Sequence, residues 1–486
     1  MFSLLPLLSL IVPFFIGVLF LFTCLFWFLE SFFKKIEKIS LLFATSLTLF
    51  IVLSMLPYVL AGETLETSEL SLRVDLTNVA GIFGVALIFF LTSIYNVKAE
   101  KGGRLKPGLY NFFVLLFLVC MLGLLLSYDL FGIFFFVELT IGVSIILVAH
   151  APGKLSPEAA FKYLIITAIS ALFVLLGVLT VFIVTHNSSI SAIMSNPYSL
   201  IENSRLLLLV VACFIVGLGA DIGLVPFHGW VPDVFPASTP IINSFFCAEP
   251  IALIFALYKL IYPFYVVYPS AVIISLVVGV GLVSMAFGVF MAYPQKDFMR
   301  MIAYCSIDEF GHMVFALGLF TSLSFTAGQL YLVNGALMKA GILQCLGSVF
   351  ITSGTQNMDS LGGLVRRMKK TSGSYIICVL SLAGVPPLSG FYAKWLLYNA
   401  VYDFLLPQAG VFISVLALIS LVGVSTISFI FLVRSFHRIF LGQLAETSKN
   451  IDEVHWTMWF PTAFLAGVAI LVGLQPYLLL SLIRPP

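Results

Sequence analysis

The sequence is poor in charged residues. Of its 486 residues, only 9% are Asp, Glu, Lys or Arg, whereas 61% are hydrophobic, and the mean hydropathy is +1.13. Soluble globular domains carry roughly 25% charged residues, so the composition excludes an ordinary water-soluble protein. The net charge of +2 is too small to indicate a nucleic-acid partner.

Cysteine motifs and cofactor signatures are also missing. The seven cysteines are scattered singly, with no CxxC or CxxH spacing, which argues against a metal cluster or a disulfide framework. The sequence holds no nucleotide, flavin, haem or iron–sulfur signature. We therefore expect no metal and no cofactor in this chain.

What the sequence does contain is a series of long apolar runs. A run of about 20 apolar residues spans a bilayer as a helix, and fourteen such runs occur. The expected helices are 3–29, 39–60, 78–97, 109–127, 130–149, 158–185, 205–225, 238–258, 268–292, 300–320, 325–351, 374–397, 409–433 and 457–482. The first run lacks the basic region of a signal peptide and is too long for one. The connections are short, so the sequence predicts an all-α membrane protein with one transmembrane domain over residues 1–486.

The lysines and arginines are distributed unevenly among the connections. Eighteen fall in or next to the odd-numbered connections and only four in the even-numbered ones or at the carboxyl end. Those four are Arg73, Arg205, Lys259 and Arg484. Because cytoplasmic loops are rich in Lys and Arg, the odd-numbered loops are expected to be cytoplasmic. The pattern predicts a multi-pass protein of the cell membrane or another energy-transducing membrane, with both termini on the non-cytoplasmic side and lipid around it.

Seven charged residues lie at membrane depth. They are Glu138, Asp221, Glu249, Asp308, Glu309, Lys339 and Lys394. Each costs about 2.5–3.5 kcal/mol at the centre of an inserted helix, so seven facing lipid would cost on the order of 20 kcal/mol, more than a typical domain's whole stability. We expect these side chains to face one another, a water-filled path or the protein interior, and to mark a functional site. For any single one, a structural hydrogen bond between helices is the alternative.

Two predicted helices are broken by proline. The first break is at Pro226 and the second at Pro386 and Pro387, about 160 residues later. Proline removes a backbone donor and leaves carbonyls that need partners. Breaks at corresponding positions of two halves indicate an inverted-repeat transporter with its ion path at the breaks. Two ordinary proline kinks are the alternative.

Four motifs resemble those of a known family. They are "VPFHGWVPDVFPASTP", "MRMIAYCSIDEFGHMVFALG", "NGALMKAGIL" and "GVPPLSGFYAKWLL". In this order, over about residues 75–440, they are similar to the antiporter-like subunits of respiratory complex I, Mrp antiporters, membrane-bound hydrogenases and sulfur reductases.

The resemblance implies a division of the chain into two inverted five-helix repeats, each forming half of a proton path. The implied parts are helices 1–3 (1–108), a first repeat of helices 4–8 (109–258), a second repeat of helices 9–13 (268–436), and a carboxyl-terminal helix (457–486). Helices 7 and 12 would be the broken ones.

The resemblance also implies roles for single residues. Glu138, Lys339 and Lys394 match charged positions on helices five, eleven and twelve of the family. Asp221 stands where the family has the lysine of helix seven, and Glu249 lies two residues before the helix-eight lysine position. The segment "YCSIDEFGH" adds acids and a histidine where the family is mostly serine, glutamine and tyrosine; they are Asp308, Glu309 and His312.

The exchange of lysine for Asp221 raises a specific expectation. The family pairs the helix-five glutamate with that lysine, whereas here Glu138 would face a second carboxylate. Two acids a few ångströms apart in a low dielectric cannot both ionise cheaply. We expect Glu138 and Asp221 to share a proton, or a cation to bridge them. His228, just past the break, is either a partner of Asp221 or a cap on the freed backbone.

Three functional hypotheses follow. The first is an H⁺- or Na⁺-translocating subunit of a multisubunit respiratory or Mrp-type complex. Its ion path would run through Glu138, Asp221, Glu249, His312, Lys339 and Lys394, beside other membrane subunits, antiporter-like neighbours and possible redox subunits. The second is a structural relative that no longer pumps because it lost the helix-seven lysine. The third is a self-contained carrier of a small solute, for which the sequence shows no wide substrate site.

Overall fold

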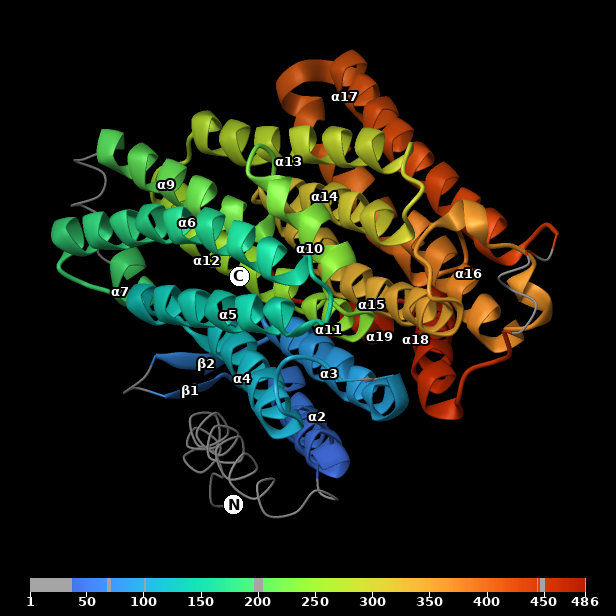
Figure 1. Ribbon diagram of the computed structural model, residues 1–486. Coiled ribbons are helices and arrows are strands. Elements are labelled where there is room, and N and C mark those ends of the chain that lie inside the picture. Colours follow the sequence, from blue (N-terminus) through green and yellow to red (C-terminus); the bar gives the residue numbers. More distant parts are fainter. Residues whose placement is uncertain are drawn as a thin grey trace.

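The structure, a computed structural model, describes residues 37–67, 71–99, 102–195, 204–443, 445 and 451–485. This part of the chain is a bundle of α-helices with one short hairpin (Figure 1). The elements are α2 (Glu37–Leu60), β1 (Leu65–Thr67), β2 (Leu72–Val74), α3 (Val79–Ala99), α4 (Pro107–Leu126), α5 (Leu130–His150), α6 (Ser156–Thr185), α7 (Ile190–Ser195), α9 (Ser204–Ile222), η1 (His228–Trp230), α10 (Val231–Ala237), α11 (Pro240–Phe246), α12 (Glu249–Val267), α13 (Ala271–Ala292), α14 (Phe298–Leu317), α15 (Ser322–Ser353), η2 (Met358–Ser360), η3 (Leu364–Arg366), α16 (Lys369–Ala383), α17 (Ser389–Phe440), α18 (Trp456–Leu474) and α19 (Tyr477–Leu480).

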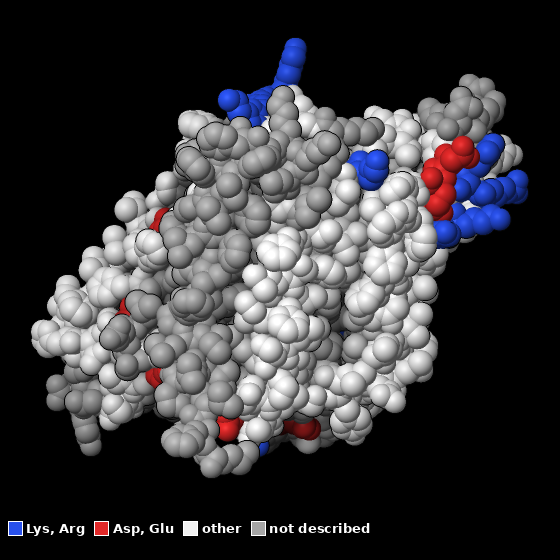
Figure 2. Space-filling model, turned by 90° about the horizontal axis from the view of Figure 1, so that it is seen from below, with Lys and Arg blue, Asp and Glu red and all other residues white. Residues whose placement is uncertain are grey.

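The helices confirm an all-α, multi-pass membrane protein. Within the described ranges, eleven helical segments are long and apolar enough to cross a membrane. Helix α14 has comparable length but carries three charged residues, and α16 has only 15 residues. The predicted count of fourteen is therefore not confirmed. The predicted helix 3–29 lies outside the described residues, and the inverted repeats stay a prediction. On the face seen in Figure 2, most described residues are uncharged, and the Lys and Arg side chains gather mainly near one edge.

Predicted helix eight is two helices. Helix α11 ends at Phe246, and α12 begins at Glu249 after a two-residue turn. Pro250 has no backbone N–H to donate to the preceding turn, so the helix restarts there with proline in its first turn. The structure thus has a third break that the sequence analysis does not predict, and Glu249 lies at it.

Predicted helix twelve is also divided. Helix α16 ends at Ala383 and α17 begins at Ser389, so the predicted break around Pro386 and Pro387 is present. Helix α17 then continues through residues 398–408, where the sequence predicts a connection. Its backbone leaves helical geometry at Gly410, where φ is 78°.

Helix α15 lies at the centre of the bundle. It packs against α3, α11, α14, α16, α17 and α18, and nearly all of its residues from Phe325 to Val349 are buried. A helix surrounded by protein can carry a charged side chain away from lipid. Lys339 is on this helix.

Candidate functional site

Asp221 lies where helix α9 stops. The helix ends at Ile222 because Gly223 adopts φ +89°, a left-handed conformation that glycine takes without a Cβ clash, and Pro226 follows without a backbone donor. The side chain of Asp221 is 1% exposed, and neither carboxylate oxygen accepts a hydrogen bond from any residue that the structure describes. The hydroxyl of Ser170 lies beside it but donates to the carbonyl of Gly217 at 2.8 Å. An ionised carboxylate in this position is costly to bury.

The charged side chains that act on Asp221 are themselves acids. Glu138 on α5 and Glu249 on α12 are both close enough to interact with it electrostatically. Glu138 is half-buried, and its Oε1 atom has no hydrogen-bond partner among the described residues. The structure therefore brings together the three acids predicted for the first half. In the described part of the chain, no group of three His, Cys, Asp or Glu side chains is arranged to hold a metal ion, so a bridging cation would need further oxygen ligands.

Glu249 accepts a hydrogen bond from Tyr163, and the Ser144 hydroxyl lies beside both. The Tyr163 hydroxyl on α6 donates to Glu249 Oε1 at 3.3 Å. The same hydroxyl accepts from Ser144 Oγ on α5 at 3.1 Å. Sequence analysis names neither Tyr163 nor Ser144, because a tyrosine and a serine in apolar helices are common packing residues and only the fold shows what they contact.

Trp230 and His228 both lie at the break after α9, where His228 interacts with the backbone of Pro226. The indole of Trp230 donates to the carbonyl of Ala220 at 2.9 Å, and Val225 N donates to Ser284 Oγ at 3.0 Å. The ring of His228 also packs against Phe287, with centroids 4.3 Å apart. No hydrogen bond or ion pair joins His228 to Asp221 among the described residues, so the structure gives no support to that predicted pairing.

In the second half, Glu309 and Lys339 form a buried ion pair. Oε2 of Glu309 on α14 lies 2.6 Å from Nζ of Lys339 on α15, and the two side chains are 2% and 4% exposed. The ammonium also lies over the ring of Phe310, 4.6 Å from its centroid. Pairing lets both charges stay buried without facing lipid.

Asp308 takes different partners from its neighbour in sequence. Its Oδ1 lies 3.1 Å from Nδ1 of His312, one turn along α14, and its Oδ2 accepts from Ser428 Oγ on α17 at 2.6 Å. The His312 ring stacks on Tyr331 of α15 at 5.5 Å. The Nε2 atom of His312 is buried and, within the described ranges, has no hydrogen-bond partner. This cluster links α14, α15 and α17.

Lys394 lies at the second helix break. Its Nζ donates at 3.0 Å to the carbonyl of Ala383, which is the last residue of α16. The lysine thus satisfies a carbonyl freed by the break. Asp308 and Glu309 are close enough to act on it electrostatically. Lys394 also lines a cavity of about 440 Å³, together with exposed Trp395.

The two groups of charges meet near the break between α11 and α12. Cys247, in the turn between these helices, lies near Lys339 and Glu309. Glu249 follows two residues later and faces Tyr163. The break thus lies between the first-half acids and the second-half ion pair.

A further buried lysine, Lys259, escapes sequence analysis because hydropathy places it in a connection. It lies in α12, is 5% exposed, and its Nζ donates to three carbonyls at the end of α4. These carbonyls belong to Leu124 (2.8 Å), Leu125 (3.1 Å) and Ser127 (2.6 Å). When a lysine lies near the end of an apolar run, the sequence does not show whether its side chain points into the protein or into solvent.

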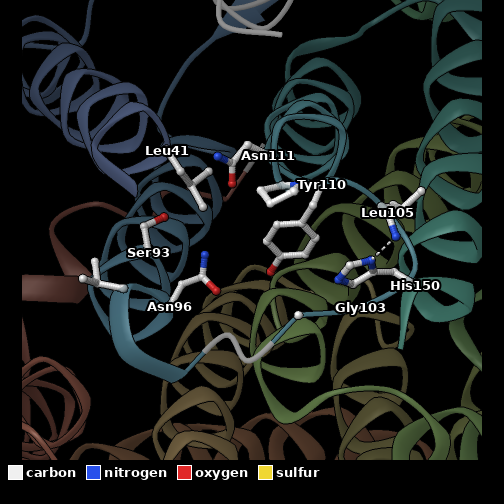
Figure 3. A pocket seen from close by; sticks show the side chains of 11 residues that line it. Leu41, Ser93, Asn96, Gly103, Leu105, Tyr110, Asn111 and His150 are labelled. Atoms are coloured by element: carbon white, nitrogen blue, oxygen red, sulfur yellow. Dashed lines mark hydrogen bonds between the residues drawn. The ribbon is translucent and has the colours of Figure 1, made fainter. Parts of the chain in front are cut away.

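A separate cavity of about 180 Å³ lies between α2, α3, α4 and the end of α5 (Figure 3). In it, Leu105 N donates to His150 Nδ1 at 3.1 Å, and the His150 ring stacks on Tyr110 at 4.8 Å. Gly103 passes so close that a Cβ there would lie 2.3 Å from the His150 ring. None of the predicted site residues lines this cavity.

Comparison with known proteins decides the family. The profile described as "NADH:quinone oxidoreductase/Mrp antiporter, TM" matches residues 127–420, more than half of the chain. The chain belongs to this family. The matched region contains every predicted site residue, from Glu138 to Lys394. The chain is therefore an antiporter-like membrane protein.

Individual relatives agree with this assignment. NADH-quinone oxidoreductase subunit N of Desulforudis audaxviator is 29% identical over 354 residues, 70% of this chain and 68% of that protein. Na(+)/H(+) antiporter subunit A1 of Staphylococcus aureus (strain JH9) is 28% identical over 427 residues, 83% of this chain but only 52% of that longer protein. Another Na(+)/H(+) antiporter protein, from Alkalihalophilus pseudofirmus, is 25% identical over 400 residues, 81% of this chain and 77% of that protein.

Two solved structures share the fold of this antiporter-like protein. A chain of the Mrp complex from Dietzia sp. DQ12-45-1b superposes with a TM-score of 0.86 at 21% identity, covering 98% of this chain and 96% of that one. A chain of the membrane-bound sulfane sulfur reductase, an archaeal respiratory membrane complex, gives 0.81 at 24% identity, with 99% and 95% covered.

Proposed function

We propose that this chain is an ion-translocating subunit that moves H⁺, Na⁺ or both along a line of buried charged residues. The path comprises Glu138, Asp221, Glu249, His312, Lys339 and Lys394, supplemented by Asp308 and Glu309. The helix breaks at Pro226, Pro386 and Pro387 and the break at Glu249 open the backbone beside it. No cofactor and no catalytic chemistry are assigned to the chain.

One observation carries this proposal above the others: the Glu309–Lys339 pair at 2.6 Å. A buried ion pair is weak as a source of stability because the desolvation of both charges offsets their attraction. Two further titratable groups, Asp308 and Lys394, are close enough to Glu309 to interact with it electrostatically. Several ionisable groups buried together within the membrane-spanning part of a protein indicate an ion path rather than a purely structural interaction between helices.

The proposal includes partners. The named relatives belong to NADH-quinone oxidoreductase and to Na(+)/H(+) antiporters, and the solved neighbours are multisubunit membrane complexes. We assign this chain to a respiratory or Mrp-type complex with other membrane subunits, including antiporter-like neighbours. Redox subunits, where the complex has them, would carry the electron chemistry. The basic loops are assigned to the cytoplasmic side and both termini to the other.

A second candidate function is a structural subunit without pumping activity. The observation in its favour is Asp221, which stands at the lysine position of the family and has no hydrogen-bond partner in the described part of the chain. In this account the first-half acids stay protonated and inert.

The test is ion flux in proteoliposomes that contain the intact complex, with pH-sensitive dye and radioactive sodium as readouts. Lys339→Ala is expected to abolish flux, whereas Lys296→Ala, which removes an exposed lysine paired with Asp359, is expected to leave it unchanged. Flux retained by an assembled Lys339→Ala complex would overturn the proposal. Asp221→Asn separates the two candidates: loss of flux supports a working first half, and wild-type flux supports the structural function for that half.

A further inference from the structure

Three side chains from three helices form an unbroken line of contacts in the first half. Ser144 of α5 donates to Tyr163 of α6 at 3.1 Å, and Tyr163 donates to Glu249 of α12 at 3.3 Å. All three side chains are buried. Helices α5 and α6 lie side by side, with α12 behind them (Figure 1), and α12 contacts α5.

The Tyr163 hydroxyl is held in this line by its ring. The ring stacks on Trp230 with centroids 4.1 Å apart and an angle of 22° between the planes. Trp230 is in turn fixed by its hydrogen bond to the carbonyl of Ala220, the residue before Asp221. Asp221 and Glu249 are the carboxylates that act on Tyr163, so the hydroxyl lies among acids and has no basic partner in the described structure.

The line suits a proton and does not suit a sodium ion. A hydroxyl both donates and accepts a hydrogen bond, so a proton can pass along direct contacts without occupying space. A sodium ion needs several oxygen ligands and room between them. Here the hydroxyls bond to each other directly, and the tyrosine ring is packed against an indole.

We propose that Tyr163 is a proton-relay residue that makes the step between α5 and Glu249 selective for protons over sodium ions. The inference rests on the function proposed above and assigns the ion for that step. The proton enters the line at Ser144, its α5 end.

The step balances without any further reactant. A proton binds the Ser144 oxygen, the original Ser144 proton moves to the Tyr163 oxygen, and the original Tyr163 proton moves to the Glu249 carboxylate, which becomes neutral. Each hydroxyl ends with one proton, and rotation of both resets the line. Ser144 has a second acceptor, the carbonyl of Ile141 at 2.8 Å. Because Ser144 has a single proton, it interrupts the relay when it turns to Ile141 and completes it when it turns to Tyr163.

The experiment measures proton and sodium flux in proteoliposomes of the intact complex carrying Tyr163→Phe, Ser144→Ala or both. Each single variant is expected to lower proton flux by about tenfold or more, as for loss of a positioned proton-transfer group. The double variant is expected to be no worse than either single one, because two breaks in one series line act as one. Sodium flux that is not coupled to proton exchange is expected to stay at its wild-type level. Independent packing defects would instead multiply and lower all fluxes together.

The matched control is Tyr375→Phe. Tyr375 is also fully buried, its hydroxyl contacts Ser435 at 2.6 Å and its ring stacks on Phe436, but no carboxylate of the described residues is bonded to it. It is expected to keep wild-type flux. Ser144→Ala decides alone if Tyr163→Phe fails to assemble.

Two contrary results are distinguishable. Wild-type proton flux in assembled Tyr163→Phe, with flux lost in Lys339→Ala, overturns the relay and leaves the proposed function standing. Wild-type flux in Lys339→Ala overturns the proposed function, and the relay with it.

Discussion

Lys339 and Glu309 meet across two helices, with Nζ and Oε2 2.6 Å apart and both side chains sealed from solvent. Lys339 sits on the central helix of the bundle, and Glu309 lies next to Asp308, which binds His312 and Ser428 instead. Two adjacent acids on α14 thus serve separate partners. This arrangement connects the centre of the bundle to the break at Lys394, on which both acids act.

Removing one member of this pair should be worse than removing both. Glu309→Gln leaves the Lys339 ammonium buried and unpaired, which is expected to destabilise the protein by about 3–5 kcal/mol. The double variant Glu309→Gln, Lys339→Met removes both charges and should recover most of that loss while lacking ion flux. Thermal unfolding of the purified complex measures the first effect and proteoliposomes the second. Equal stability of the single and double variants would contradict a buried pair.

Lys259 is expected to matter for stability and not for flux. Lys259→Met leaves the carbonyls at the end of α4 without their donor, at roughly 1–3 kcal/mol for a buried unsatisfied group. The unfolding midpoint should fall, whereas flux per assembled complex should match the wild type. Lys296→Met, at an exposed lysine, is the control and should change neither. A loss of flux in stable Lys259→Met complexes would place this lysine on the path instead.

Glu453 is expected to anchor the start of α16. Its carboxylate accepts from Lys370 N at 2.7 Å and from Thr371 Oγ1 at 2.6 Å. Glu453→Ala should therefore cost about 1 kcal/mol, in line with losing a helix cap. Asp452→Ala is the matched control. Asp452 is 85% exposed and forms a surface ion pair with Arg367, with 3.5 Å between Oδ1 and Nη1. The two variants should differ in unfolding midpoint; identical midpoints would show that the cap contributes nothing.

Gly390 allows close approach at the second break. A Cβ at this position would lie 1.8 Å from the carbonyl oxygen of Ser381, so Gly390→Ala must push α17 away from α16. We expect loss of assembly on native gels. Gly423→Ala, in the same helix but with nothing within 4 Å of its Cβ, should assemble normally. Normal assembly of Gly390→Ala would mean that the two helices do not pack as described.

Sequence analysis identifies most of the buried charges but few of their contacts. Lys339 and Glu309 lie within apolar runs, where a charge that faced lipid would be costly. Their burial can therefore be predicted from the sequence. Which acid meets Lys339 depends on how α14 and α15 pack, and the sequence holds no measure of that distance.

The remaining differences between sequence and structure have similar physical causes. The break before Glu249 is hidden because Pro250 lies within an otherwise continuous apolar run. Hydropathy predicts a connection at residues 398–408, although they continue α17. It also predicts a loop position for Lys259, because helix ends cannot be placed within a turn from hydropathy alone.

The most direct measurement of the central claim is ion flux through proteoliposomes that contain the intact complex with Lys394→Ala. Trp395→Ala, which alters the next residue on the rim of the same cavity, serves as the matched control. The account predicts that Lys394→Ala abolishes flux in a complex that assembles normally, whereas Trp395→Ala retains it. Wild-type flux in assembled Lys394→Ala would contradict the claim that the buried charges carry the ion.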